Sequence, residues 1–164
     1  MPFDLSTFTQ IHTVVSLLAL ATGLIVVFGM LAGSRLNGVT AIYLLSSVAT
    51  SAGGFGFPFD HFLPSHWISV LSLVLLLVAI LARYVFHFAG GWRWIYVVAT
   101  TLTVYFLVFV AAVQAFMKVP ALRALAPTQT EPPFVYVQGG VLIVFIMLTV
   151  AALRAFHPAG AAER

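Results

Sequence analysis

Long apolar stretches fill most of this chain, and only short polar segments separate them. Five runs stand out, at roughly residues 11–32, 39–57, 67–88, 92–116 and 134–156. A helix of about 20 mostly apolar residues crosses the roughly 30 Å of hydrocarbon in a bilayer, and each run reaches or nearly reaches that length. The pattern predicts an all-α integral membrane bundle of five transmembrane helices in a single domain over residues 1–164. The second run is the weakest, because glycines and Pro58 end it early, so whether it fully spans stays open.

The composition supports a membrane setting and excludes several other classes of protein. Hydrophobic residues make up 62% of the chain and charged residues only 7%, far from the usual range of soluble domains. Seven Lys and Arg against four Asp and Glu give too small a positive excess for a nucleic-acid surface, so we expect no nucleic-acid partner. The absence of cysteine excludes disulfides and thiolate metal sites.

The charged residues of the connecting segments predict an orientation. One side of the membrane would carry five cations: Arg35, Arg83, Arg93, Arg154 and Arg164. The other side would carry Asp4, Asp60, Lys118, Arg123 and Glu131. Cytoplasmic connections are enriched in Lys and Arg, so we expect the amino terminus outside and the carboxyl terminus in the cytoplasm. Arg83 lies close to a helix end, so we expect it to reach lipid headgroups.

Bulky polar residues cluster near the predicted outer ends of the helices. His12, Gln114 and Gln138 would lie at similar depth, with His66, Lys118 and Glu131 above them. The outer connection at residues 118–133 contains a helix-forming stretch at 121–126 between prolines, and we expect it to carry a short interfacial helix over this polar layer. The Ser, Thr, Gly and Ala residues that recur at helical spacing are interpreted as helix-packing faces.

An apolar slot with a few hydrogen-bonding groups at its mouth is the usual form of a site for a hydrophobic small molecule. The outer polar layer therefore predicts a pocket for a quinone or lipid-like molecule, formed by His12, Gln114, Gln138, His66, Lys118 and Glu131 and lined further in by Tyr105 and phenylalanines. A partner membrane subunit or a second copy of the chain could take the same place. Two further alternatives stay open: a small transporter or channel component, and a b-type haem electron-transfer protein that uses His12 and His66 as axial ligands. No catalytic motif is found, so the sequence decides neither an enzymatic activity nor a cofactor.

Three segments resemble those of small, uncharacterised bacterial polytopic membrane proteins. They read SAGGFGFPFDHFLPSH, LARYVFHFAGGWRWIY and VQAFMKVPALRALAPTQTEPPF, and together they cover about a third of the chain. The resemblance implies a bacterial inner-membrane location. It implies no activity and no functional residues.

Overall fold

The protein is an antiparallel bundle of long helices joined by short connections. The computed structural model describes residues 5–58, 60–61 and 64–158. The long helices are α1 (Leu5–Leu31), α2 (Asn37–Gly53), α3 (Pro64–Ile80), α4 (Trp92–Lys118) and α6 (Pro132–Ala155), and the short ones are η1 (Gly54–Gly56), η2 (Leu81–Val85) and α5 (Pro120–Leu125). Five helical segments are long and apolar enough to cross a membrane, and the described residues contain no β-strand. The predicted all-α membrane bundle is confirmed.

Helix boundaries differ from the apolar runs where polar residues continue a helix. Helix α1 begins at Leu5, six residues before the first run, because its opening turns contain polar residues that are compatible with a helix. Helix α2 continues through the 3₁₀ turn η1, so this segment reaches 20 residues, Asn37–Gly56. The predicted short helix in the last connection is present as α5, with Pro120 in its first turn.

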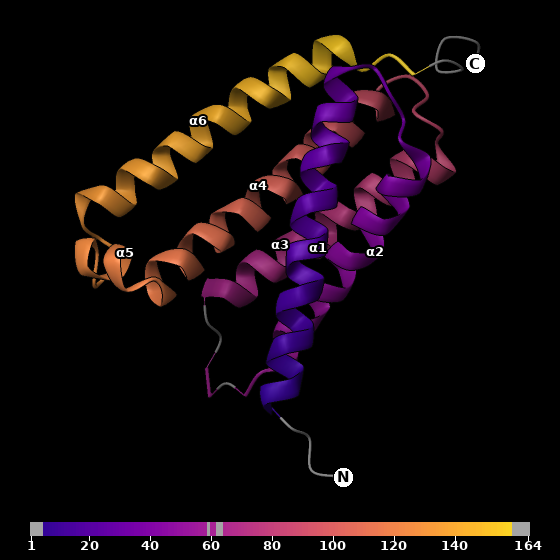
Figure 1. The fold of residues 1–164 in the computed structure, drawn as a ribbon. Coiled ribbons are helices and arrows are strands. Elements are labelled where there is room, and N and C mark those ends of the chain that lie inside the picture. Colours follow the sequence, from indigo (N-terminus) through magenta and orange to yellow (C-terminus); the bar gives the residue numbers. More distant parts are fainter. Residues whose placement is uncertain (1–4, 59, 62–63, 159–164) are drawn as a thin grey trace.

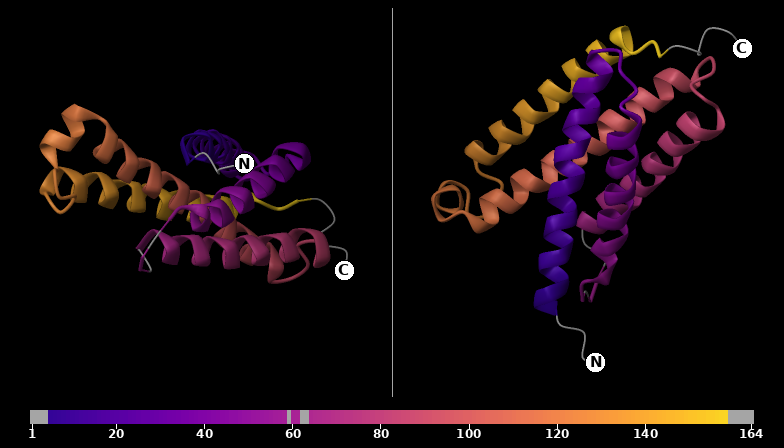
Figure 2. Two further views of the ribbon diagram at one scale, coloured as in Figure 1. Left: turned by 90° about the horizontal axis from the view of Figure 1, so that it is seen from below. Right: turned by 45° about the vertical axis from the view of Figure 1, so that its right-hand side comes forward.

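Neighbouring helices in the chain pack side by side, and α1 also crosses α4. Helix α1 packs along α2, α3 along α4, and α4 along α6. Figures 1 and 2 show α6 lying along α4 and away from α2 and α3. We call one end of the bundle the arginine end, which holds the connections at 32–36, 86–91 and 156–158. The other is the α5 end, where α4 finishes and α1, α3 and α6 begin (Figure 1).

Helices α1, α2 and α4 are in close contact at Gly23. A Cβ atom on Gly23 would lie 2.9 Å from Val104 Cγ2 and 3.0 Å from Tyr43 Cε2, so a larger residue would push the helices apart. Tyr43 is fully buried here, and its hydroxyl donates a hydrogen bond to the carbonyl of Thr100 at 3.4 Å. From this point towards the α5 end, α1 and α4 diverge (Figure 1). The divergence leaves space between them.

Arg83 is buried in the bundle, so the expectation that it contacts lipid headgroups is wrong. Only 6% of the residue is exposed. Its guanidinium donates hydrogen bonds to Asn37 Oδ1 at 2.7 Å, to the carbonyl of Arg35 at 3.0 Å and to the Tyr96 hydroxyl at 3.3 Å. The π-helical turn η2 contains Arg83, and its extra residue per turn changes the face on which the following side chains lie. Arg83 therefore holds the connection between α1 and α2 against α4.

Two consecutive residues with positive φ close the turn after η2. His87 has φ of 48° and Phe88 has φ of 64°, a conformation that non-glycine residues rarely adopt. Phe88 is buried, and the guanidinium carbons of Arg35 and Arg83 lie 5.1 and 5.6 Å from its ring centroid. These packing and cation–π contacts offset the backbone cost of the turn.

Candidate functional site

A cavity of about 690 Å³ lies between α1, α2, α3 and α4 in the half of the bundle towards the α5 end. This volume falls within the roughly 300–1,000 Å³ typical of small-molecule sites. The lining comprises Thr9, His12, Thr13, Ser16, Leu17, Leu20, Thr50, Ser51, Gly54, Phe57, Pro58, Ser65, His66, Ile68, Ser69, Ser72, Phe106, Leu107, Val110, Ala111, Gln114, Ala115 and Lys118. The cavity is therefore the space that opens where α1 and α4 diverge.

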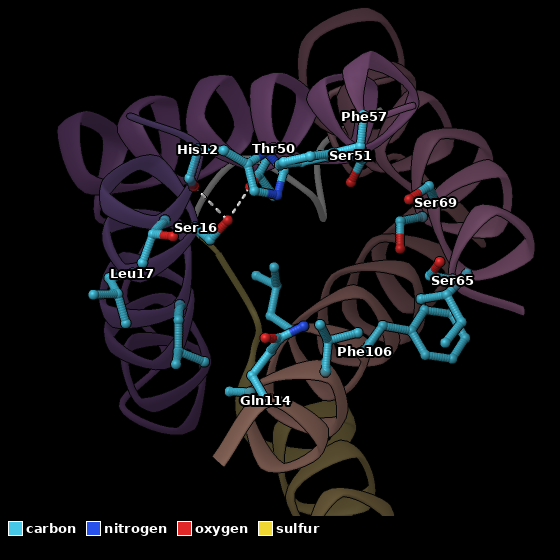
Figure 3. A pocket seen from close by; sticks show the side chains of 18 of the residues that line it. His12, Ser16, Leu17, Thr50, Ser51, Phe57, Ser65, Ser69, Phe106 and Gln114 are labelled. Carbon is cyan, nitrogen blue, oxygen red and sulfur yellow. Dashed lines mark hydrogen bonds between the residues drawn. The ribbon is translucent and has the colours of Figure 1, made fainter. Parts of the chain in front are cut away.

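One wall of the cavity is rich in hydroxyl groups. Figure 3 shows Ser51, Ser65 and Ser69 on the side formed by α2 and α3. On α1, the Ser16 hydroxyl donates to the carbonyl of His12 at 2.7 Å and also forms a hydrogen bond with the Thr50 hydroxyl. These groups give the cavity a polar surface within the helical bundle.

Several of these hydroxyls have no hydrogen bond to another described residue. Serine and threonine in membrane helices commonly donate to a carbonyl in the preceding turn, as Thr22 and Ser46 do in this bundle. The hydroxyls of Ser51, Ser69 and Ser72 form no hydrogen bond, to a preceding carbonyl or to any other group, within the part of the chain that the structure describes. Their hydroxyls are thus available to a molecule in the cavity.

The opposite wall comes from α4 and is mainly apolar. Phe106, Leu107, Val110, Ala111 and Ala115 line it. Two polar residues follow towards the α5 end, Gln114 and Lys118. Figure 3 shows Gln114 extending from α4 towards the side of the cavity that carries Ser16 and Thr50. An occupant would therefore meet hydrocarbon on one side and hydrogen-bonding groups on the other.

Aromatic contacts orient the two histidines that line the cavity. The His12 imidazole packs edge-on against the Phe57 ring, with centroids 5.1 Å apart and an interplanar angle of 89°. A Cβ atom on Gly53 would lie 3.0 Å from His12 Nδ1, so glycine makes room for the imidazole. The His66 ring stacks on Phe55 at 5.4 Å and is buried.

Most polar groups of the described lining can both donate and accept hydrogen bonds, and one of them is a cation. Two imidazoles, one amide, one ammonium and the hydroxyl groups are present, and none of the described Asp or Glu residues belongs to the lining. Among the described residues, no three His, Asp or Glu side chains are grouped so that they could hold a metal ion. The Lys118 ammonium therefore favours an occupant that places acceptor oxygens or negative charge at that end of the cavity.

The structure brings together four of the six predicted site residues. His12, His66, Gln114 and Lys118 line the cavity. Gln138 lies elsewhere, between α6 and α4, where its Nε2 donates to the carbonyl of Phe109 at 3.2 Å. Gln114 and Gln138 are predicted at the same depth in the membrane, but only Gln114 faces the cavity.

Glu131 also lies outside the cavity and organises the connection before α6. Its carboxylate accepts hydrogen bonds from the Thr128 hydroxyl at 2.8 Å and from the backbone N–H groups of Thr128 and Thr130 at 3.1 Å. Burial acts to raise the pKa of Glu131, but these hydrogen bonds to the charged form together lower its pKa below the ordinary value. Glu131 is thus a loop-ordering residue in this structure.

The connection at residues 118–133 does not cover the cavity as expected. Of that segment only Lys118 contributes to the lining, because α5 packs against α4. Tyr105 was also expected in the slot, but it lines a separate groove of about 200 Å³ between α4 and α6. Among the described residues, the phenylalanines that line the cavity are Phe57 and Phe106.

The hydroxyl wall is the part of the site that sequence reasoning missed. Small polar residues at helical spacing usually mark close helix packing, and that pattern predicts helix contacts at the positions of this wall. The helical spacing of these residues correctly predicts that their side chains point into the bundle. Whether the helices touch there or enclose a space depends on the crossing of α1 and α4, which no local pattern records.

Compared with known proteins, the chain matches no protein-family model, no curated protein and no solved structure.

Proposed function

We propose that this integral membrane protein binds a hydrophobic small molecule, of a quinone or lipid-like type, in the cavity between α1 and α4. The single observation that supports this is the combination of a hydroxyl-rich wall and an apolar wall around about 690 Å³ of space. A purely structural bundle would fill such a space with side chains, because protein interiors are close-packed. Lys118, the charged group of the described lining, favours a head group with acceptor oxygens, such as carbonyls or a carboxylate, and the amide and hydroxyl groups can donate to it as well.

In this proposal the residues have separate roles. His12, Gln114 and Lys118 donate hydrogen bonds to the head group near the α5 end, and the free serine hydroxyls of α2 and α3 supply further donors. The apolar residues of α4 pack against the hydrocarbon part. His66 contributes to the polar wall, where Phe55 fixes its ring. No chemical step is assigned to any of these residues.

Stabilisation by a decyl-substituted benzoquinone tests the binding proposal. A ligand that binds only the folded protein raises its stability by about 2.7 kcal/mol at 100 times the dissociation constant, so the melting temperature should increase with probe concentration. Ala111→Trp places a large side chain in the cavity and should abolish this increase. Ala21→Trp changes an exposed α1 residue outside the lining and should retain it. Equal increases in the melting temperature of the two variants would contradict the proposal. Mass analysis of lipid extracted with the purified protein would identify the natural occupant.

A b-type haem is the second candidate, because His12 and His66 both line this one cavity. Bundle haems are held by histidines on facing helices. Protein purified from haem-sufficient cells would then show a Soret band, which His12→Ala and His66→Ala would each remove. We expect no such band. A stoichiometric, histidine-dependent spectrum would replace the small-molecule proposal with electron transfer.

We further propose that the protein resides in a bacterial inner membrane with the α5 end outside. Arg35 in the α1–α2 connection, Arg93 in the first turn of α4 and Arg154 in the last turn of α6 support this orientation. Reporter fusions after Arg35, Gly91 and Arg164 should read as cytoplasmic, and a fusion after Arg123 should read as external. A cytoplasmic signal at Arg123 would overturn the orientation and leave the cavity unaffected.

A further inference from the structure

The cavity has an open edge at the middle of α1. Leu17 and Leu20 both line the cavity, but Leu17 is 58% exposed whereas Leu20 is partly buried, so Leu17 has accessible surface beyond that of a residue within the lining. Helix α1 has 27 residues, from Leu5 to Leu31, and Leu17 is near its centre. At 1.5 Å per residue, Leu17 lies about 18 Å from one end and about 21 Å from the other. For a helix that spans a bilayer, this depth is in the hydrocarbon, where no water is present to fill an opening.

The facing edge of the opening is formed by α4. Gln114 is exposed and lines the cavity, and the lining continues along α4 from Lys118 to Phe106, about 18 Å at the helical rise. The contact of Gly23 with Val104 closes the space towards the arginine end. The result is an elongated slot between α1 and α4 that opens sideways into the membrane.

The geometry points to a lateral portal: we propose that the occupant is an amphiphile with a single long hydrocarbon chain, which enters between α1 and α4 from the bilayer and leaves part of its chain outside. This inference rests on the proposed small-molecule binding and specifies the class of ligand and its route. The head carries acceptor oxygens and reaches His12, Gln114 and Lys118, each of which can donate to it. The chain passes Leu17 and continues among lipid tails, so the cavity need hold only the head and the first part of the chain.

Two adjacent leucines on α1 provide a matched test of the portal. Leu17 and Leu18 are both exposed, at 58% and 46%, but only Leu17 belongs to the cavity lining. Leu17→Trp therefore narrows the slot, and Leu18→Trp places the same bulk on the lipid-facing side. Melting temperatures of the two variants without probe establish that both are folded.

The experiment uses photoreactive probes in phosphatidylcholine vesicles that contain the reconstituted protein. Two probes carry a long chain with a diazirine, one a benzoquinone with an isoprenoid tail and the other a fatty acid. A third, a short-chain benzoquinone with the same photoreactive group, tests the head alone. Leu17→Trp should reduce labelling by at least one long-chain probe about tenfold, the loss expected when roughly two methylene groups no longer fit. Labelling by the short-chain probe should change by less than about twofold, a minor change in affinity. Its head reaches His12, Gln114 and Lys118, and it has no long chain that must pass Leu17.

The outcomes separate the portal from the binding proposal. Which long-chain probe labels the wild-type protein identifies the head as carbonyl or carboxylate. Equal long-chain labelling of the Leu17→Trp and Leu18→Trp variants would overturn the portal, as would an equal loss of short-chain and long-chain labelling in Leu17→Trp. If no probe labels the wild-type protein, or if Ala111→Trp leaves all labelling unchanged, the proposed function itself is wrong.

Discussion

Replacing Gln138 with leucine removes a buried amide that links α6 to α4. Its Nε2 donates to the carbonyl of Phe109 at 3.2 Å, whereas its Oε1 is buried without a hydrogen-bond partner among the described residues. Only 9% of the residue is exposed, so neither atom has ready access to another partner. Leucine removes both the hydrogen bond and the unpaired acceptor, and the balance of these two effects decides the sign of the stability change.

The unpaired acceptor is the larger of the two effects. Hydrogen bonds between transmembrane helices contribute about 0.6 kcal/mol on average. A buried acceptor without a partner costs about 1 to 3 kcal/mol. Gln138→Leu should therefore raise the free energy of unfolding by about 0.5 to 2 kcal/mol. Gln114 is exposed at the cavity, so Gln114→Leu should change stability by less than about 0.5 kcal/mol and weaken binding of the benzoquinone probe.

Unfolding titrations in SDS for both single variants and the double variant measure these effects. Gln138 bonds to Phe109 and Gln114 faces the cavity, so the two changes should add to within about 0.5 kcal/mol. Probe-dependent stabilisation should be retained in Gln138→Leu. A destabilised Gln138→Leu variant whose stability returns in the double variant would show that the two amides pair, and the placement of Gln138 outside the cavity would then be refuted.

Three further predictions concern the scaffold. Arg83→Met should lower the free energy of unfolding by about 2 kcal/mol. Hydrogen bonds to a charged group contribute about 1.5 to 3 kcal/mol each, and relief of the buried charge offsets only part of that loss. Arg123→Met, on the exposed face of α5, is the control, and equal stability of the two variants would contradict the role of Arg83. Gly23→Ala should lower the melting temperature because its Cβ meets Val104 at 2.9 Å, whereas Gly139→Ala, with no atom within 4 Å, should leave it unchanged or raise it through better helix propensity. Glu131 has a lowered pKa in the folded state, so its stabilising effect is present above the unfolded-state pKa and is lost as the pH falls through the lowered value. Hydrogen exchange at Thr128 and Thr130 should therefore be faster in Glu131→Gln at neutral pH, and wild-type exchange equal to that of the variant would exclude the carboxylate as the cause.

The position of His12, Gln114, His66 and Lys118 near one end of the bundle was predictable from residue spacing alone. Helices that must cross a bilayer have a nearly constant length, so the place of a residue within its apolar run gives its depth. The short helix after Pro120 was predictable for a similar reason, since prolines bound a stretch of good helix formers. Depth does not give rotation, however. Gln138 shares the predicted depth of Gln114 and faces a different neighbour.

The sequence by itself determined the five apolar helices, their alternating direction and the polar layer at one end, because these depend on local hydrophobicity and on the thickness of the bilayer. Only the tertiary structure decided that Arg83 turns inward, that Gln138 joins α6 to α4, and that serines of α2 and α3 face a cavity instead of another helix. The physical reason that the serines face a cavity is the way α1 packs on α4 at Gly23. Gly23 lets α1 pack directly against Val104 of α4 and Tyr43 of α2, and α1 and α4 separate from this contact towards the α5 end (Figure 1). A helix-packing pattern is the same in sequence whether the facing helices meet or diverge.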